Sequence, residues 1–163
     1  MAFILGDQRD ADVGEAFRRY SEYLEAERTR FPAGALALAT SEWYFNPEDH
    51  RCPHDAWLQH LVVQETGRGE RHQHRAVGLS IQLLGAYHDL VLTFTYGHVY
   101  RYTLDTYEDI RAGHSDWRYD EFRVNGDGHL LHEIEWRGNN KGARWLIEAD
   151  DVALEWSACA RGA

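Results

Sequence analysis

Apolar residues recur every three or four positions between residues 11 and 31, and Glu and Arg fill most of the positions between them. This spacing gathers the apolar side chains on one face, so the segment predicts an amphipathic α-helix. Asp10 or Asp12 can cap its first turn, and Pro32 ends it. The residues expected on its buried face are Val13, Phe17, Tyr20, Leu24 and Phe31.

After Pro32 the apolar period shortens to about two residues, which is the period of a β-strand. Leu36 and Leu38, followed by Trp43 and Phe45, predict a first strand that is broken near residue 40. A second strand is expected from Trp57 to Glu65, with apolar residues on both faces and therefore covered on both. Further strands are predicted at 77–84, 90–96, 99–104, 117–124, 130–136, 143–148 and 152–156.

Polar and glycine-bearing segments separate these strands. Residues 67–75 are expected to form an exposed connection, and Asn125–Gly128 and Gly138–Gly142 are hairpin signals. Eight or nine short strands after one helix predict a mainly β fold, either an antiparallel β-sandwich or a partly open barrel. Residues 1–163 read as a single domain, with the β core over 35–157 and core residues Trp57, Leu79, Ile81, Leu83, Leu92, Phe94, Ile134 and Trp136.

Composition narrows the classes of function. The formal net charge of −10 repels phosphate backbones and anionic lipid, so neither a nucleic acid nor a membrane is expected as a partner. No basic and then apolar signal segment starts the chain, so a cytoplasmic location is expected. The two cysteines, Cys52 and Cys159, are expected to be reduced in that compartment.

One short segment has the composition of a metal site. His50, Cys52 and His54 alternate along the chain, and imidazole with thiolate is a ligand set that zinc accepts. Pro53 interrupts the segment and no second ligand pair follows, so the alternative is a turn whose side chains bond the backbone. His132, alone on an apolar face, is expected to be a core histidine satisfied by a neighbour.

His54-Asp55 and His88-Asp89 each come directly before a β-prone run. The dipeptide resembles the one for which a class of helical metal phosphohydrolases is named, but here both pairs precede strands. We therefore expect a structural role, in which Asp55 and Asp89 accept backbone N–H bonds at the start of each strand and the histidines support the turn.

Three stretches carry a resemblance to a known group: Pro53-His54-Asp55-Ala56-Trp57-Leu58, residues 83–89 and residues 145–156. In pattern, residues 40–157 resemble small bacterial β-rich proteins, some of which are grouped with immunity proteins of polymorphic toxin systems. The resemblance implies an intracellular protein that neutralises a toxin by binding it, without catalysis.

Acidic residues in the last third of the chain would suit a basic toxin, and the alternative is a solvated surface that keeps the protein soluble. The leading hypothesis is a non-catalytic binding protein. A metal-dependent hydrolase or a small-ligand binder that uses the His-rich turn at 50–55 is the alternative, and a structural subunit whose aromatic faces mediate oligomerisation is a third hypothesis. The candidate partner-binding residues are Asp116, Asp120, Glu121, Glu148, Asp150, Asp151 and Glu155.

Overall fold

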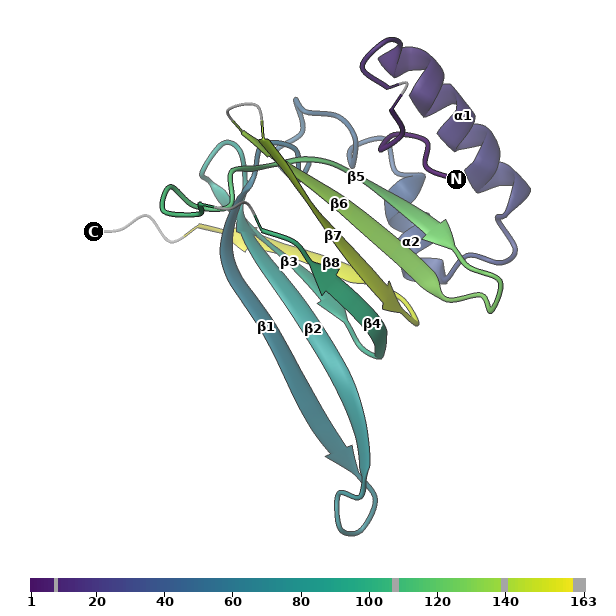
Figure 1. Cartoon of the computed structure of the whole chain (residues 1–163), viewed down its shortest axis with the longest axis vertical. Helices are drawn as coiled ribbons and strands as arrows, with labels where there is room; N and C mark the ends of the chain where they lie inside the picture. The colour runs from purple at the N-terminus through teal and green to yellow at the C-terminus, as the bar shows by residue number, and fades with distance from the viewer. Residues whose placement is uncertain (8, 107–108, 139–140, 160–163) are drawn as a thin grey trace.

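The computed structural model describes residues 1–7, 9–106, 109–138 and 141–159. Within them, two helices precede eight antiparallel strands that form one open sheet in the order β4-β7-β6-β5-β1-β2-β3-β8 (Figure 1). The expectation of a mainly β, antiparallel fold is confirmed. The elements are α1 (Val13–Ala26), α2 (Ala33–Ala39), β1 (Trp57–Arg68), β2 (His74–Leu84), β3 (Leu90–Tyr96), β4 (Val99–Leu104), β5 (Asp116–Val124), β6 (Leu130–Gly138), β7 (Lys141–Ala149) and β8 (Ala153–Ala158).

The sheet consists of two four-stranded halves joined at one corner. β5 meets β1 only where Trp57 pairs with Asp116, supported by the bonds from Asp55 N to Trp117 O (2.8 Å) and from Trp117 N to Ala56 O (3.0 Å). Away from this corner the halves diverge and enclose the core, and β4 approaches β2. The largest fully buried side chains include Trp117, Trp136, Trp145, Phe94 and Phe122.

Helix α1 follows the predicted apolar pattern but ends at Ala26, before residue 31. The Asp12 carboxylate accepts the backbone N–H of Glu15 at 2.9 Å, which confirms an N-cap from one of the two expected aspartates. Tyr20 and Leu24 are buried against the sheet, whereas Val13 at the first turn is exposed.

The predicted strand around Leu36 and Leu38 is wrong, because this segment is the helix α2. Four alanines in seven residues favour a helix. Its first amides are bonded from the other end of the chain: Asp151 accepts Gly34 N at 2.8 Å and Ala35 N at 2.9 Å. A Cβ on Gly34 would lie 2.2 Å from the Val152 carbonyl oxygen, so only glycine permits this approach.

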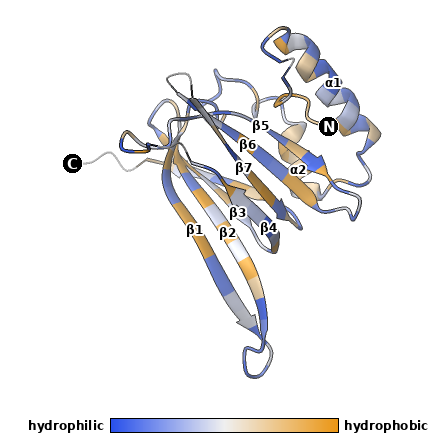
Figure 2. Ribbon diagram, viewed as in Figure 1, coloured by the Kyte–Doolittle hydropathy of each residue, from blue (hydrophilic) through white to orange (hydrophobic). Residues whose placement is uncertain are grey.

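The period-two pattern correctly located seven of the eight predicted core residues, and Figure 2 shows the alternation along β2. Trp57 is the exception, with half of its surface exposed. The Asn125–Gly128 hairpin is confirmed by the bond from Asn125 N to His129 O at 3.0 Å. The second hairpin joins β6 to β7 as predicted, although Asn139 and Asn140 at its tip lie outside the described residues.

Candidate protein-binding edge

Strand β1 has a neighbour along only one side. Leu58–Arg68 is paired with β2 throughout, apart from a bulge near Leu58, whereas on the other side only Trp57 is paired. Within the described part of the chain, no backbone hydrogen bond joins Leu58–Arg68 to any segment other than β2. We call this side the β1 edge. Its unpaired N–H and C=O groups form a template on which another strand can pair.

The β1 edge lacks the features that usually prevent strand pairing. From Leu58 to Gln64 it carries no Lys, Arg, Asp, Glu, Gly or Pro. All of β1 is exposed except Leu58 and Leu61, which are half-buried, and Val62 and Val63 are 46% and 40% exposed. The prediction that this strand is covered on both faces is therefore wrong.

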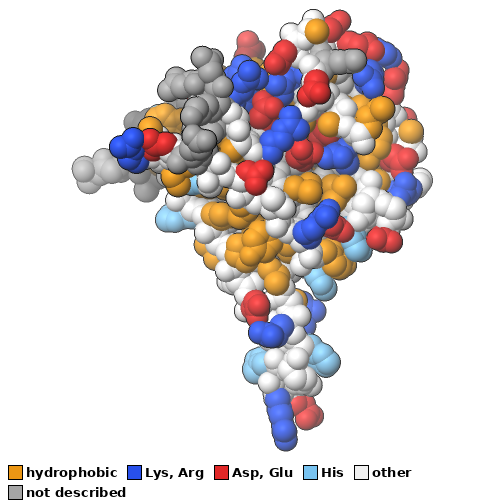
Figure 3. Space-filling view, viewed as in Figure 1, with side chains coloured by type: hydrophobic (Ala, Val, Ile, Leu, Met, Phe, Trp, Pro, Cys, Tyr) orange, Lys and Arg blue, Asp and Glu red, His pale blue; other side chains and the backbone are white. Residues whose placement is uncertain are grey.

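The outer parts of β1 and β2, residues 64–78, project beyond β3 from the body as an arm (Figure 1), and basic side chains lie at its tip (Figure 3). Residues 65–75 contain three arginines and two glutamates, together with His72 and His74. Arg75 and Glu65 form a surface ion pair at 2.9 Å. A Cβ on Gly67 would lie 2.5 Å from the His72 Cβ, so a glycine is needed where the tip folds back.

At the base of the arm, His88 and Asp89 contact residues on either side of the His54-Asp55 pair. His50 Nδ1 lies 2.6 Å from an Asp89 carboxylate oxygen, and Trp57 contacts the His88 ring at 4.5 Å. Asp55 accepts a bond from Arg118 at 3.3 Å. Both pairs do precede strands, but their carboxylates bond side chains rather than the backbone N–H groups that we predicted. Both carboxylates are about half exposed.

The structure does not bring His50, Cys52 and His54 together as a ligand set. His50 turns toward Asp89, while His54 Nδ1 lies 3.2 Å from Asp55. Burial raises the pKa of the Cys52 thiol to about 12, which opposes formation of the thiolate that zinc binds. Among the described residues, no group of three or more His, Cys, Asp or Glu side chains is placed to hold a metal ion. Cys52 and Cys159 form no disulfide.

The seven acidic residues predicted to bind a partner do not form one face. Asp120 and Glu121 are buried, and Asp151 caps α2. The Glu148 side chain is mostly buried, forms an ion pair with Arg101 and lies 3.0 Å from His129 Nδ1. The remaining three sit on separate elements: Asp116 at the corner of the sheet, Asp150 bonded by the Tyr100 hydroxyl, and Glu155 on β8.

Asp120 belongs to a polar network sealed in the core. It accepts bonds from the Tyr44 hydroxyl (2.7 Å) and Trp117 Nε1 (3.0 Å), and it lies 2.9 Å from His132 Nε2. The other nitrogen of His132 lies 2.6 Å from the Tyr96 hydroxyl, so the expectation of a satisfied core histidine is confirmed. The adjacent cavity of about 20 Å³ is too small for more than a single water. Asp120 and His132 are both buried, so the network lies inside the core.

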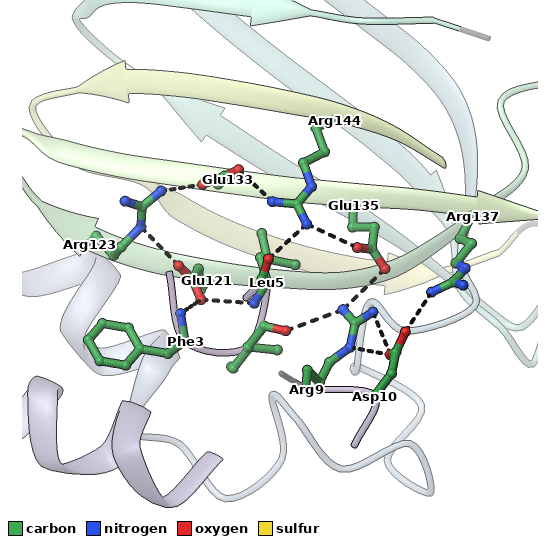
Figure 4. A network of polar contacts seen from close by, with 11 residues as sticks. Phe3, Leu5, Arg9, Asp10, Glu121, Arg123, Glu133, Glu135, Arg137 and Arg144 are labelled. Atoms are coloured by element: carbon green, nitrogen blue, oxygen red, sulfur yellow. Dashed lines mark hydrogen bonds and ion pairs between the residues drawn. The ribbon is translucent and has the colours of Figure 1, made fainter. Parts of the chain in front are cut away.

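A set of acidic and basic side chains fastens the N-terminal segment across the outer face of β5, β6 and β7 (Figure 4). Glu121 accepts the backbone N–H groups of Phe3 (2.9 Å) and Leu5 (3.2 Å), and Arg144 donates to the Leu5 carbonyl (2.8 Å). Acidic and basic groups alternate along it, so each faces an opposite charge. This charge chain consists of Glu121, Arg123, Glu133, Arg144, Glu135, Arg9, Asp10 and Arg137.

Comparisons with protein-family models, with curated proteins and with solved structures found no match to this chain. Neither of its described helices is long and apolar enough to cross a lipid bilayer. The sequence pattern correctly placed the start of β1 at Trp57, but it ended the strand at Glu65 instead of Arg68 and missed its free edge. The available signal was the uncharged stretch Leu58–Gln64 next to a strongly charged connection.

Proposed function

We propose that this chain is a non-catalytic protein-binding domain whose binding element is the β1 edge. The observation that carries the proposal is that Leu58–Arg68 forms a strand, bulged near Leu58, with backbone pairing on one side only. A partner would add a strand to this edge, so that main-chain bonds supply affinity and the side chains of alternate residues supply specificity.

The apolar side chains of the edge support the same function. Val62 and Val63 point to opposite faces of the sheet, and both are substantially exposed. An added strand would cover part of each face beside them. Burial of apolar surface contributes about 25 cal/mol per Å², which adds to the backbone bonds that the partner makes.

A basic toxin as the partner, with the chain acting as an immunity protein, remains a prediction within this proposal. The support for a basic partner is the formal net charge of −10 on this chain. The dispersed positions of Asp116, Asp150 and Glu155 give it no single acidic surface to meet such a partner. The hydrolase alternative has no support from the His-rich turn, where the imidazoles and the thiol do not converge.

A display selection tests the proposal directly. The protein is immobilised at low density, so that neighbouring copies cannot meet, and a library of random 12-residue peptides is selected on it. We expect enrichment of extended sequences with alternating apolar residues. These peptides should lose binding to a Val62→Lys, Val63→Lys double variant, because lysines on both faces of the edge keep hydrated charges where the peptide must pack.

Thr95→Lys is the matched control, because Thr95 is exposed on β3, a paired strand of the same half. Peptides that bind the double variant as well as the wild type would place the binding surface elsewhere. A selection that enriches no peptide would also contradict the proposal.

A further inference from the structure

We infer that the occupant of the β1 edge is a second copy of this chain, paired antiparallel about a two-fold axis. This inference rests on the proposed function of the edge and names the partner. The two β1 strands would join their sheets into one continuous sheet, with the same residues contributed by each copy.

The position of the free segment sets the register. The edge opens after Trp57, which is paired with Asp116, and it ends at Arg68, where the arm turns. If all eleven free residues pair with their counterparts, Val63 lies on the two-fold axis and faces Val63 of the other copy. Leu58 then faces Arg68, and Val62 faces Gln64.

This register places apolar residues at the centre of the contact. Val62 and Val63 are exposed in one copy, and they would pack beside the same pair of the other copy. An uncharged run of seven residues on a free edge is otherwise an aggregation hazard. A closed two-fold pair covers the run in both copies and leaves no β1 edge open.

Charge along the arm is self-complementary in the antiparallel arrangement. The tip has three arginines, Arg68, Arg71 and Arg75, against two glutamates, whereas three aspartates lie around the base, where Arg118 contacts one of them. The three are Asp55, Asp89 and Asp116. Antiparallel pairing brings the tip of each arm to the base of the other. A parallel arrangement would instead place two basic tips together.

The net charge of −10 on each copy opposes association in general. At physiological ionic strength, however, charges are screened beyond about 8 Å, so only groups close to the contact contribute strongly. In this register Glu65 of each copy faces the uncharged Leu61 of the other, and Arg68 faces Leu58, which lies next to the Trp57–Asp116 pair. Attraction between opposite charges near the contact is therefore retained, whereas the longer-range repulsion between the two bodies is screened.

The first measurement is the mass of the full chain in solution, by light scattering after size exclusion and by sedimentation over a range of concentrations. We expect a reversible dimer. Val63→Lys should give monomers, because it sets two lysines opposite each other on the axis. Thr95→Lys should leave the dimer intact, and thermal melts should show that both variants are folded.

A charge exchange then tests the symmetry. Val63→Lys and Val63→Glu should each be monomeric alone and should form a mixed dimer when combined, because a Lys then faces a Glu. If the mixture remains monomeric while wild type dimerises, the two Val63 residues do not face each other and the inferred two-fold register fails.

A cysteine on the axis tests the register. In a Cys159→Ser background, Val63→Cys should form an intermolecular disulfide readily on mild oxidation, because opposite residues in an antiparallel pair have Cα atoms about 4.5–5.5 Å apart. Thr95→Cys in the same background should not. Equal cross-linking of both variants would contradict the register.

A wild-type chain that is monomeric at every concentration would overturn the inference. The proposed function would survive that result if selected peptides still bind wild type and not the Val62→Lys, Val63→Lys double variant. Loss of both results would remove the β1 edge as a binding element altogether.

Discussion

β5 and β1 adjoin each other at the corner of the sheet, yet the backbone groups on their free edges differ in their hydrogen-bond partners. On β5, the Tyr20 hydroxyl accepts Phe122 N at 2.8 Å and donates to Phe122 O at 2.9 Å, while the Tyr23 hydroxyl accepts Val124 N at 2.9 Å. Helix α1 thus closes that edge with side chains. Along Leu58–Arg68, among the described residues, the one side chain bonded to a backbone group of this segment is His72 at the tip, whose Nδ1 lies 3.2 Å from the Gly67 carbonyl oxygen.

The difference extends to the faces of the two strands. The outer face of β5 is covered by the N-terminal segment, in which Ile4 and Leu5 are buried and the charge chain fixes the backbone. The arm, by contrast, is exposed on both faces for most of β1. The proposed association rests on this contrast between an edge that a helix closes and a longer edge that stays open.

Breaking the polar network that ties the two halves together should have the largest effect on stability. Asp120→Ala leaves Tyr44, Trp117 and His132 without their shared acceptor in the core. We expect the free energy of unfolding, measured by urea denaturation, to fall by about 3–5 kcal/mol, because unpaired buried donors keep their desolvation cost. Asp127→Ala on the exposed β5–β6 turn is the control, and an equal loss in both variants would contradict this role.

Opening the β5 edge should have the next largest effect. Tyr20→Phe removes the hydroxyl that serves both backbone groups of Phe122, and we expect a loss of about 1–3 kcal/mol together with faster hydrogen exchange of the Phe122 amide. Tyr87→Phe, which removes a half-exposed hydroxyl bonded to the Pro47 carbonyl, should change stability much less. Unchanged exchange at Phe122 would show that α1 does not close this edge.

The smallest effect concerns the pH dependence of the covered face. Burial, the largest cause, raises the pKa of the Glu121 carboxyl above its ordinary value of 4.5. The folded state therefore holds this proton more tightly than the unfolded state. The contribution of Glu121 to stability is then greatest below pH 4.5 and declines as the pH rises through the raised pKa.

Glu121→Gln cannot ionise, so its stability relative to wild type should increase as the pH is raised from 4 to 7 in a series of urea denaturations. Glu155→Gln on exposed β8 controls for the loss of a carboxyl group. A difference between Glu121→Gln and wild type that stays constant with pH would show that Glu121 keeps its ordinary pKa in the fold.

The sequence by itself determined most of the strand positions and the buried faces of β2, β3 and β6. Alternation at Leu79, Ile81 and Leu83 is a local property, because one face of a strand must be apolar wherever a core covers it. The cap at Asp12 and the hairpin at Asn125–Gly128 were predictable for the same reason, since side chain and backbone lie within a few residues.

Tertiary structure decided the features that depend on distant partners. Helix α2 replaced the predicted strand where Asp151, more than a hundred residues away, bonds its first amides. Asp120 and Glu121 were predicted at the surface but lie inside, because the donors that satisfy them come from Tyr44, His132 and the N-terminal segment.

The sequence pattern likewise did not predict that Trp57 and the β1 edge are exposed. The sequence pattern of an apolar strand is the same whether or not another layer covers it, because the periodicity depends on the side chains of the strand itself and not on its neighbours. The order of strands places β5 beside β1 for one residue pair only, and that arrangement leaves the remaining eleven residues of β1 open on one side.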